Sequence, residues 1–152
     1  FNDTLDLTGA PNLELDFDPG VDRNATYVSG DGTTTLVFQY TTVAGDNTTD
    51  LDYVGVGSLD LDGGTLVGVD LIAADLSLPA PGAPGSISNA NAVVIDAIAP
   101  VVLTVGSPNA NTTYGANATL TVSVTFDKPV NVTGSPLVEL NFDSTPDRNA
   151  HI

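Results

Sequence analysis

The side chains that could support catalysis are few in this sequence. A serine triad needs a histidine base, and His151 is the only histidine among the 152 residues. The segment that contains it recurs at residues 1–27, where the equivalent position is Thr26. Aspartates are abundant, but no set of aromatic residues accompanies them to build a pocket, and the glycine patterns of nucleotide-binding loops are absent. The sequence therefore predicts no catalytic residue and no enzyme activity.

Clusters of aspartate suggest a calcium site, because Ca²⁺ prefers several carboxylate and carbonyl oxygens in a flexible loop. The clusters lack the spacing of an EF-hand or of the Gly-rich nonapeptide repeat, and turn caps or a solvated face would use the same residue type. Calcium is the only cofactor that the sequence suggests. The candidate metal ligands are Asp16, Asp18, Asp22, Asp46, Asp50, Asp52 and, beside a linker, Asp96.

Six Asn-X-Thr sequons are candidate glycosylation sites, which would place the protein at a cell surface if they carry glycans. Asn and Thr are common in this chain, so some of the sequons arise by chance. The candidate residues are Asn2, Asn24, Asn47, Asn111, Asn117 and Asn131.

Composition excludes several classes of function. The chain has 19 acidic and 3 basic residues, with a formal net charge of −16, whereas nucleic-acid binding needs a basic surface. It has no Cys, hence no disulfide, no thiol nucleophile and no thiolate metal site. No apolar run approaches the ~20 residues needed to cross a bilayer, so no membrane span is predicted.

The sequence contains an internal repeat. Residues 1–27 align without a gap with residues 126–152, at an offset of 125 and with 12 identities in 27 positions. The offset places Arg23 and Arg148 at equivalent positions, and the only two glutamates, Glu14 and Glu139, are their natural ion-pair partners. The chain thus holds one full period of 125 residues and the start of the next, which predicts a tandem repeat seen in permuted order.

Alternation of apolar and polar residues predicts strands with one solvated face, and no stretch has sustained helical periodicity. Gly- and Asp-containing turns separate the strands. Seven or eight strands in ~100–125 residues predict an all-β, immunoglobulin-like Greek-key β-sandwich. The clearest strands are 13–17, 34–40, 120–126 and 138–142, and shorter ones are 51–53, 58–61, 76–78, 93–95 and 101–105.

A short linker is predicted at residues 97–100, which follow an apolar strand and end in Pro100. Residues 1–96 would then form an immunoglobulin-like module that lacks its first strands. Residues 101–152 would be the first strands of the next module, or strands donated to a neighbouring subunit.

Three phrases of the sequence resemble a known family. They are VVIDAIAPVVLTV, TYGANATLTVSVTFDKPVNVTGSPLVELNFD and RNATYVSGDGTTTLVFQYTTVAGDNTTDLDYVGVGSLDLDGGTL. Together they resemble the bacterial immunoglobulin-like tandem repeats of large extracellular surface proteins and adhesins, over essentially the whole chain in permuted order. The sequence departs from that family at residues 67–75, where VGVDLIAAD stands in place of the expected turn with Gly and Asn. The resemblance implies an extracellular, non-catalytic stalk or adhesive array.

The predicted function is therefore a structural repeat of an extracellular stalk, adhesin or filament at the cell surface. Its expected partners are neighbouring copies of itself, joined head to tail in a covalent array or a strand-donating homopolymer. The alternative is a calcium-dependent carbohydrate- or surface-binding module, in which Tyr27, Tyr40 or Tyr53 contacts surface glycans.

Overall fold

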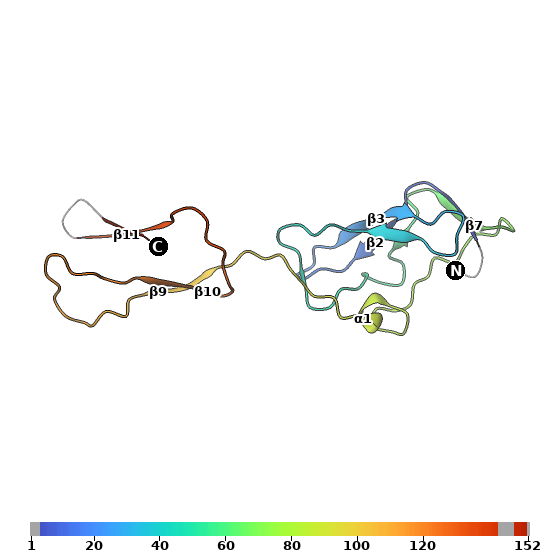
Figure 1. The fold of residues 1–152 in the computed structure, drawn as a ribbon. Helices are drawn as coiled ribbons and strands as arrows, with labels where there is room; N and C mark the ends of the chain where they lie inside the picture. The colour runs from blue at the N-terminus through green and yellow to red at the C-terminus, as the bar shows by residue number, and fades with distance from the viewer. Residues whose placement is uncertain (1–3, 143–147, 152) are drawn as a thin grey trace. The chain divides into compact units, whose positions relative to one another are not determined.

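The structure, a computed structural model, describes residues 4–142 and 148–151. The chain divides into two compact units, Phe1–Ile98 (unit 1) and Ala99–Ile152 (unit 2), which meet within the predicted linker (Figure 1). Strands make up 32% of the structure and helix 3%, in several antiparallel sheets. The prediction of a β-rich fold is confirmed, whereas the immunoglobulin-like strand order and the tandem arrangement stay predictions.

The main sheet of unit 1 has four antiparallel strands in the order β4-β3-β2-β6. Their bounds are β2 (Asn12–Leu15), β3 (Arg23–Ser29), β4 (Val37–Gln39) and β6 (Leu59–Asp60). In β2 and β3, Leu15 and Ala25 are buried while Glu14 and Asn24 are exposed, as period-2 alternation requires. The sheet therefore presents one apolar face and one solvated face.

Two smaller sheets complete unit 1. β1 (Leu5–Thr8) pairs with β7 (Thr65–Gly68), and β5 (Asn47–Thr48) pairs with β8 (Ile95–Asp96), both antiparallel. Gly64 lies so close to β1 that a Cβ on it would be 2.0 Å from the carbonyl oxygen of Thr8. A side chain at this position would therefore disturb the approach of β7 to β1.

Three local predictions differ from the structure. Residues 51–53 form no strand, because Asp52 and Tyr53 anchor a loop, and Tyr53 makes only an isolated bridge to Leu15. Residues 76–78 have no ladder partner beyond one bond from the Leu78 N–H to the Val56 carbonyl. A one-turn helix, α1 (Ile87–Ala90), was not predicted because a single turn leaves no periodicity; Ser86 caps it by accepting a bond from the Asn89 N–H.

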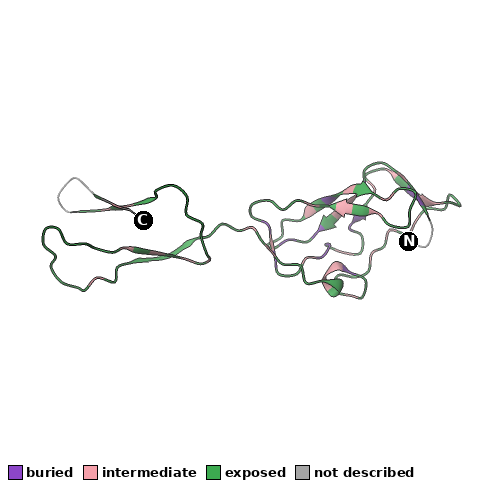
Figure 2. Ribbon diagram, viewed as in Figure 1, coloured by how far each residue is buried: buried purple, intermediate pink, exposed green. Residues whose placement is uncertain are grey.

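The core of unit 1 forms under the apolar face of the main sheet. Leu15, Phe17 and Ala25 are buried there, and Phe17 is only 1% exposed. The Phe17 ring packs on that of Tyr40, with 5.4 Å between the ring centroids. Figure 2 shows that the buried residues lie in unit 1, and none of the described residues of unit 2 is buried.

The described residues of unit 2 form two antiparallel strand pairs. β9 (Val102–Gly106) pairs with β10 (Ser123–Phe126). We call residues 101–125, which contain β9 and all of β10 except Phe126, the donor hairpin. β11 (Leu137–Leu140) pairs with β12 (Arg148–His151). Every residue of β9 is exposed, on both faces of the strand.

The repeated segments pair their strands in the same register. In unit 1, Leu13 lies opposite Ala25 and Leu15 opposite Arg23. In unit 2, the positions 125 residues later behave alike, since Val138 lies opposite Ala150 and Leu140 opposite Arg148. We call these pairs, residues 12–15 with 23–26 and residues 137–140 with 148–151, the first and second copies of the repeated hairpin.

Candidate functional site

Asp46 is a buried carboxylate that is fully engaged within unit 1. It is 2% exposed and accepts hydrogen bonds from the Arg23 Nε (3.0 Å), the Tyr40 hydroxyl (2.6 Å) and the Val43 N–H (2.7 Å). Burial raises the pKa of Asp46, but the bonds from Tyr40, Val43 and Arg23 outweigh burial and hold the pKa below its ordinary value. Asp46 thereby fixes the loop between β4 and β5.

The expected ion pair between Arg23 and Glu14 is wrong, because Arg23 pairs with Asp46 instead. Arg23 lies opposite Leu15 in the sheet, whereas Glu14 lies opposite Asn24. Neighbouring residues of a strand point to opposite faces, so Arg23 and Glu14 lie on different faces of the sheet.

Asp52 is a second buried carboxylate, and it holds the segment before α1. It accepts hydrogen bonds from the N–H groups of Tyr53 (3.0 Å), Gly82 (3.0 Å) and Ile87 (3.3 Å) and from the Ser88 hydroxyl (2.6 Å). Burial raises the pKa of Asp52, but the Ser88, Gly82 and Tyr53 bonds outweigh it and lower the pKa from 3.8 to about 2. Asp52 thereby connects Gly82, Ile87 and Ser88 to the loop at Tyr53.

The candidate calcium ligands are not brought together. No group of three Asp, Glu, His or Cys side chains that could hold a metal occurs in residues 4–142 and 148–151. Asp46 and Asp52 are occupied by the donors named above, and Asp96 accepts a bond from the Ile98 N–H (3.2 Å). The other candidates are exposed: Asp16, Asp18, Asp22 and Asp50. Calcium binding stays a prediction.

The three tyrosines of the carbohydrate alternative use their hydroxyls inside the chain. Tyr53 is buried and donates to the Pro79 carbonyl (2.6 Å), and Tyr40 donates to Asp46. The Tyr27 hydroxyl accepts a bond from the Asp31 N–H (2.9 Å). They form no exposed aromatic row on which a sugar ring would stack, so the structure adds no support to this alternative.

Most candidate glycosylation sites are exposed. Asn47 is half-buried within β5, where its carbonyl accepts a bond from the Asp18 N–H (2.7 Å). Asn2 lies outside the described residues. The exposed candidates are Asn24, Asn111, Asn117 and Asn131, and glycosylation stays a prediction.

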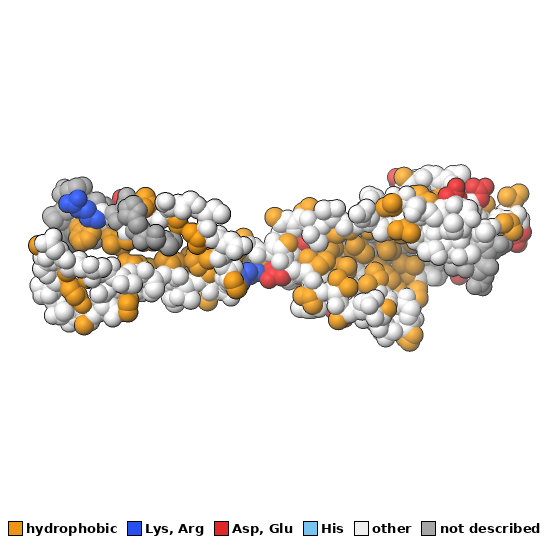
Figure 3. All heavy atoms as spheres, viewed as in Figure 1, with side chains coloured by type: hydrophobic (Ala, Val, Ile, Leu, Met, Phe, Trp, Pro, Cys, Tyr) orange, Lys and Arg blue, Asp and Glu red, His pale blue; other side chains and the backbone are white. Residues whose placement is uncertain are grey.

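An open apolar groove lies beside the core of unit 1, and we call it the unit 1 groove. Figure 3 shows hydrophobic side chains gathered on this part of unit 1. The half-buried members of the lining pack against Leu15, Phe17 and Ala25, while Thr42 is exposed. The groove is lined by Leu13, Leu15, Ala25, Phe38, Tyr40, Thr42, Leu51, Ile87 and Ile95. The groove opens beside the apolar face of the first hairpin copy, on which Ala25 is buried and Leu13 is half-buried.

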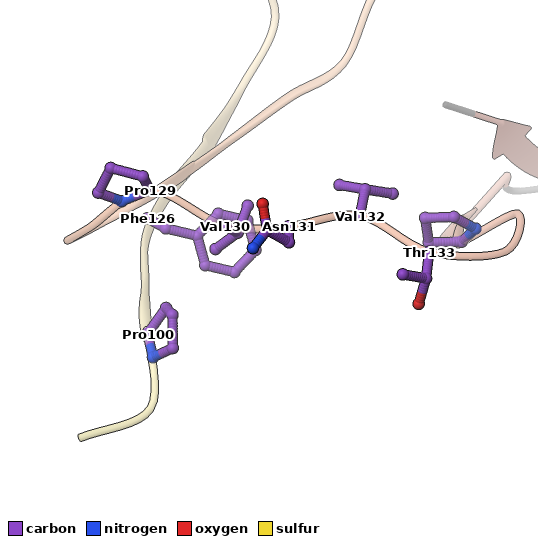
Figure 4. A pocket seen from close by; sticks show the side chains of 8 residues that line it. Pro100, Phe126, Pro129, Val130, Asn131, Val132 and Thr133 are labelled. Carbon is purple, nitrogen blue, oxygen red and sulfur yellow. The ribbon is translucent and has the colours of Figure 1, made fainter. Parts of the chain in front are cut away.

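Apolar hollows lie among the described residues of unit 2. The first lies between the donor hairpin and the second hairpin copy, and it is lined by Val122, Val124, Phe126, Val130, Val132, Val138 and Ala150. The second adjoins it and is lined by Pro100, Phe126, Pro129, Val130, Asn131, Val132, Thr133 and Pro136. Figure 4 shows that Val132 and Thr133 point to opposite sides of their segment.

Equivalent residues of the two repeats differ in burial. Phe17 is 1% exposed and its equivalent Phe142 is 43% exposed, while Leu5 is 4% exposed and its equivalent Val130 is 39% exposed. In unit 1, later parts of the chain cover these residues. Phe17 packs on Tyr40, and the strand that contains Leu5 pairs with β7. Unit 2 contains no copy of residues 28–98 to cover their equivalents.

No protein-family model, curated protein or solved structure matches this chain. In the part of the chain that the structure describes, no helix is long and apolar enough to cross a membrane. The repeat within the chain and its apolar grooves are the features that bear on function.

Proposed function

We propose that this protein is a structural, non-catalytic repeat of an extracellular stalk, adhesin or filament, whose modules follow one another head to tail. One observation carries the proposal. The same hairpin occurs twice in equal register, covered by different parts of the chain in the two units.

The two covers are complementary. Residues 28–98 pack on the first copy of the repeated hairpin and leave a groove open, whereas the donor hairpin faces the second copy and leaves the positions of Phe142 and Val130 exposed. A module with both covers would have two β-layers around one apolar core, which is the architecture of an immunoglobulin-like sandwich. This supports one repeating module, of which the chain carries parts of two successive copies.

Charge and composition are compatible with an extracellular array. A formal net charge of −16 keeps neighbouring arrays apart and soluble through mutual repulsion. Modules in such an array contact mainly their sequence neighbours, so the array extends in one dimension. Localisation outside the cell follows from this proposed role and is tested with it.

Electron microscopy of the native protein, located with an antibody raised against this chain, tests the proposal. We expect a linear structure with bead-like densities at a constant spacing, located outside the cell. A compact single particle, or antibody label inside the cell, would contradict it. A glycan array probed with and without calcium separates the alternative, because reproducible calcium-dependent hits would favour a carbohydrate-binding module.

A further inference from the structure

The unit 1 groove opens onto one face of the first copy of the repeated hairpin, where Leu13 is half-buried. Leu13 and Ala25, which lie opposite each other in β2 and β3, are both in its lining. Tyr40 and Thr42 form another part of the lining. A groove of this kind, continuous with a buried core, marks a surface that another element covers.

Unit 2 shows which element covers this face in the second copy. Val138 and Ala150, the equivalents of Leu13 and Ala25, line one hollow together with Val122 and Val124 of the donor hairpin. Val124 lies opposite Val105 in that hairpin, so both belong to the same face of the strand pair. The chain thus contains both a groove without a cover and an element that lies over the equivalent groove.

The donor hairpin has an unusual composition for this acidic protein. From residue 97 to residue 126 the sequence contains no Asp, Glu, Lys or Arg. Protein edge strands usually carry charges that prevent pairing with other chains, and this hairpin carries none. It also avoids repulsion by the negative charge of a second chain.

We propose that the unit 1 groove is a docking site for the donor hairpin, residues 101–125, of a second copy of this chain. Val122 and Val124 lie over Leu13 and Ala25 of the receiving chain. In unit 2 the same two valines lie beside Val138 and Ala150, the equivalents of Leu13 and Ala25. The segment ends at residue 125 because Phe126 has its own equivalent, Phe1, in the receiving chain. This proposal rests on the proposed function and names the partner surface through which successive modules join.

Release of the donor hairpin from its own unit costs little, because no described residue of unit 2 is buried. Leu103 and Val105 are each 61% exposed before docking. Docking removes apolar surface of both partners from water, which is the main favourable term in association.

A synthetic peptide of residues 101–125 with an amino-terminal fluorophore, titrated with the full chain, tests the docking site by fluorescence anisotropy. We expect saturable binding with one peptide per chain. A peptide with Val122→Asp and Val124→Asp should not bind, since it would place two charges in an apolar groove.

In the full chain, Thr42→Asp should weaken peptide binding about tenfold or more, because it also places a charge in the apolar groove. Thr112→Asp, at an exposed position of unit 2, is the matched control and should leave affinity unchanged.

Thr42 is exposed, so its replacement is expected to leave the fold intact, and thermal unfolding of the variant checks this. Changes in the methyl NMR signals of Leu13 and Leu51 on peptide addition provide a second readout. Absence of peptide binding, or binding that Thr42→Asp does not weaken, overturns the docking site. Such a result beside regular beads in the micrographs would leave the stalk proposal standing, whereas absence of beads contradicts the stalk proposal itself.

Discussion

Asp46 and Asp52 are ionised at neutral pH although their side chains are buried, because each accepts several hydrogen bonds from loop residues. Asp52 connects residues 82–88 to the loop that follows β5. Asp46 connects β3 to the loop that precedes β5. At the scale of single residues, stability in unit 1 depends on these two carboxylates as well as on the apolar core.

Asp52→Ala should lower the free energy of unfolding by about 1–3 kcal/mol, because the N–H groups of Gly82 and Ile87 would lose a buried acceptor. Asp50→Ala, at an exposed position two residues away, should change it by about 0.5 kcal/mol or less. Urea unfolding of both variants measures the difference. Equal changes in the free energy of unfolding for the two variants would show that the hydrogen bonds of Asp52 do not stabilise the fold.

The contribution of Asp52 should also depend on pH. Its pKa of about 2 in the folded protein lies below the ordinary 3.8, so its charge stabilises the fold above the ordinary value. That contribution is lost as the pH falls through about 4 towards 2. Other carboxylates titrate in the same range, so the comparison is with Asp52→Asn. The stability gap between wild type and variant should be constant down to about pH 5 and narrow below it. A gap that persists unchanged at pH 2 would refute this assignment.

Sequence reasoning selected both aspartates as candidate metal ligands but could not show that they are buried. A carboxylate in a loop has the same local pattern whether it faces a cation or backbone N–H groups. The distinction at Asp52 depends on Gly82 and Ser88, which are distant in sequence and are brought close only by the fold. The same holds for Arg23, whose partner Asp46 lies on a loop rather than on the neighbouring strand.

At the scale of elements, the repeated hairpin gives an internal comparison, because its two copies differ mainly in what covers them. Phe17→Ala should cost about 3–5 kcal/mol of unfolding free energy, since Phe17 is fully buried. Phe142→Ala should cost about 1 kcal/mol or less in the same chain, since much of the Phe142 side chain is already in water. Chemical denaturation at low protein concentration, where copies remain separate, measures both. Similar costs would mean that Phe142 is covered in solution.

The approach of β7 to β1 can be tested at one glycine. Gly64→Ala should lower unfolding stability by about 1–3 kcal/mol, because the new methyl group would overlap the Thr8 carbonyl. Gly57→Ala is the matched control, since a Cβ at Gly57 has no neighbour within 4 Å. Thermal unfolding distinguishes the two variants. A neutral Gly64→Ala would mean that the strands lie farther apart.

Strands with strict alternation of apolar and polar residues were predicted well. The longest strand, β3, was not predicted, and neither were β1, β7 and β12, whereas the two-residue strand β6 lies within a predicted range. β2, β4, β10 and β11 fall within or next to the predicted ranges, because their apolar residues recur at every second position. β5 and β8 have two residues each, which is too short for a repeating pattern of apolar residues, and each pairs with a strand distant in the sequence. No local pattern therefore predicts them. β7 forms at residues where the sequence departs from the expected family pattern, because its pairing with β1 defines it.

At the scale of the whole molecule, the sequence revealed the repeat and the division near residue 98, but not which surface receives which element. The unequal burial of equivalent positions in the structure, such as Leu5 and Val130, indicates which surface receives which element. The uncharged run from residue 97 to residue 126 was a sequence signal for the donor hairpin, and composition averaged over the chain concealed it.

The central claim is that residues 101–125, one copy of the repeated segment and residues 28–98 form a single module. A rearranged chain in which residues 101–152 are followed directly by residues 28–98 tests it most directly, by thermal unfolding and light scattering. We predict a monomer that unfolds in one transition about 10 °C above the parent chain, because Phe142 and Val130 become buried. A rearranged chain that unfolds in two transitions, or at or below the midpoint of the parent chain, would contradict the account.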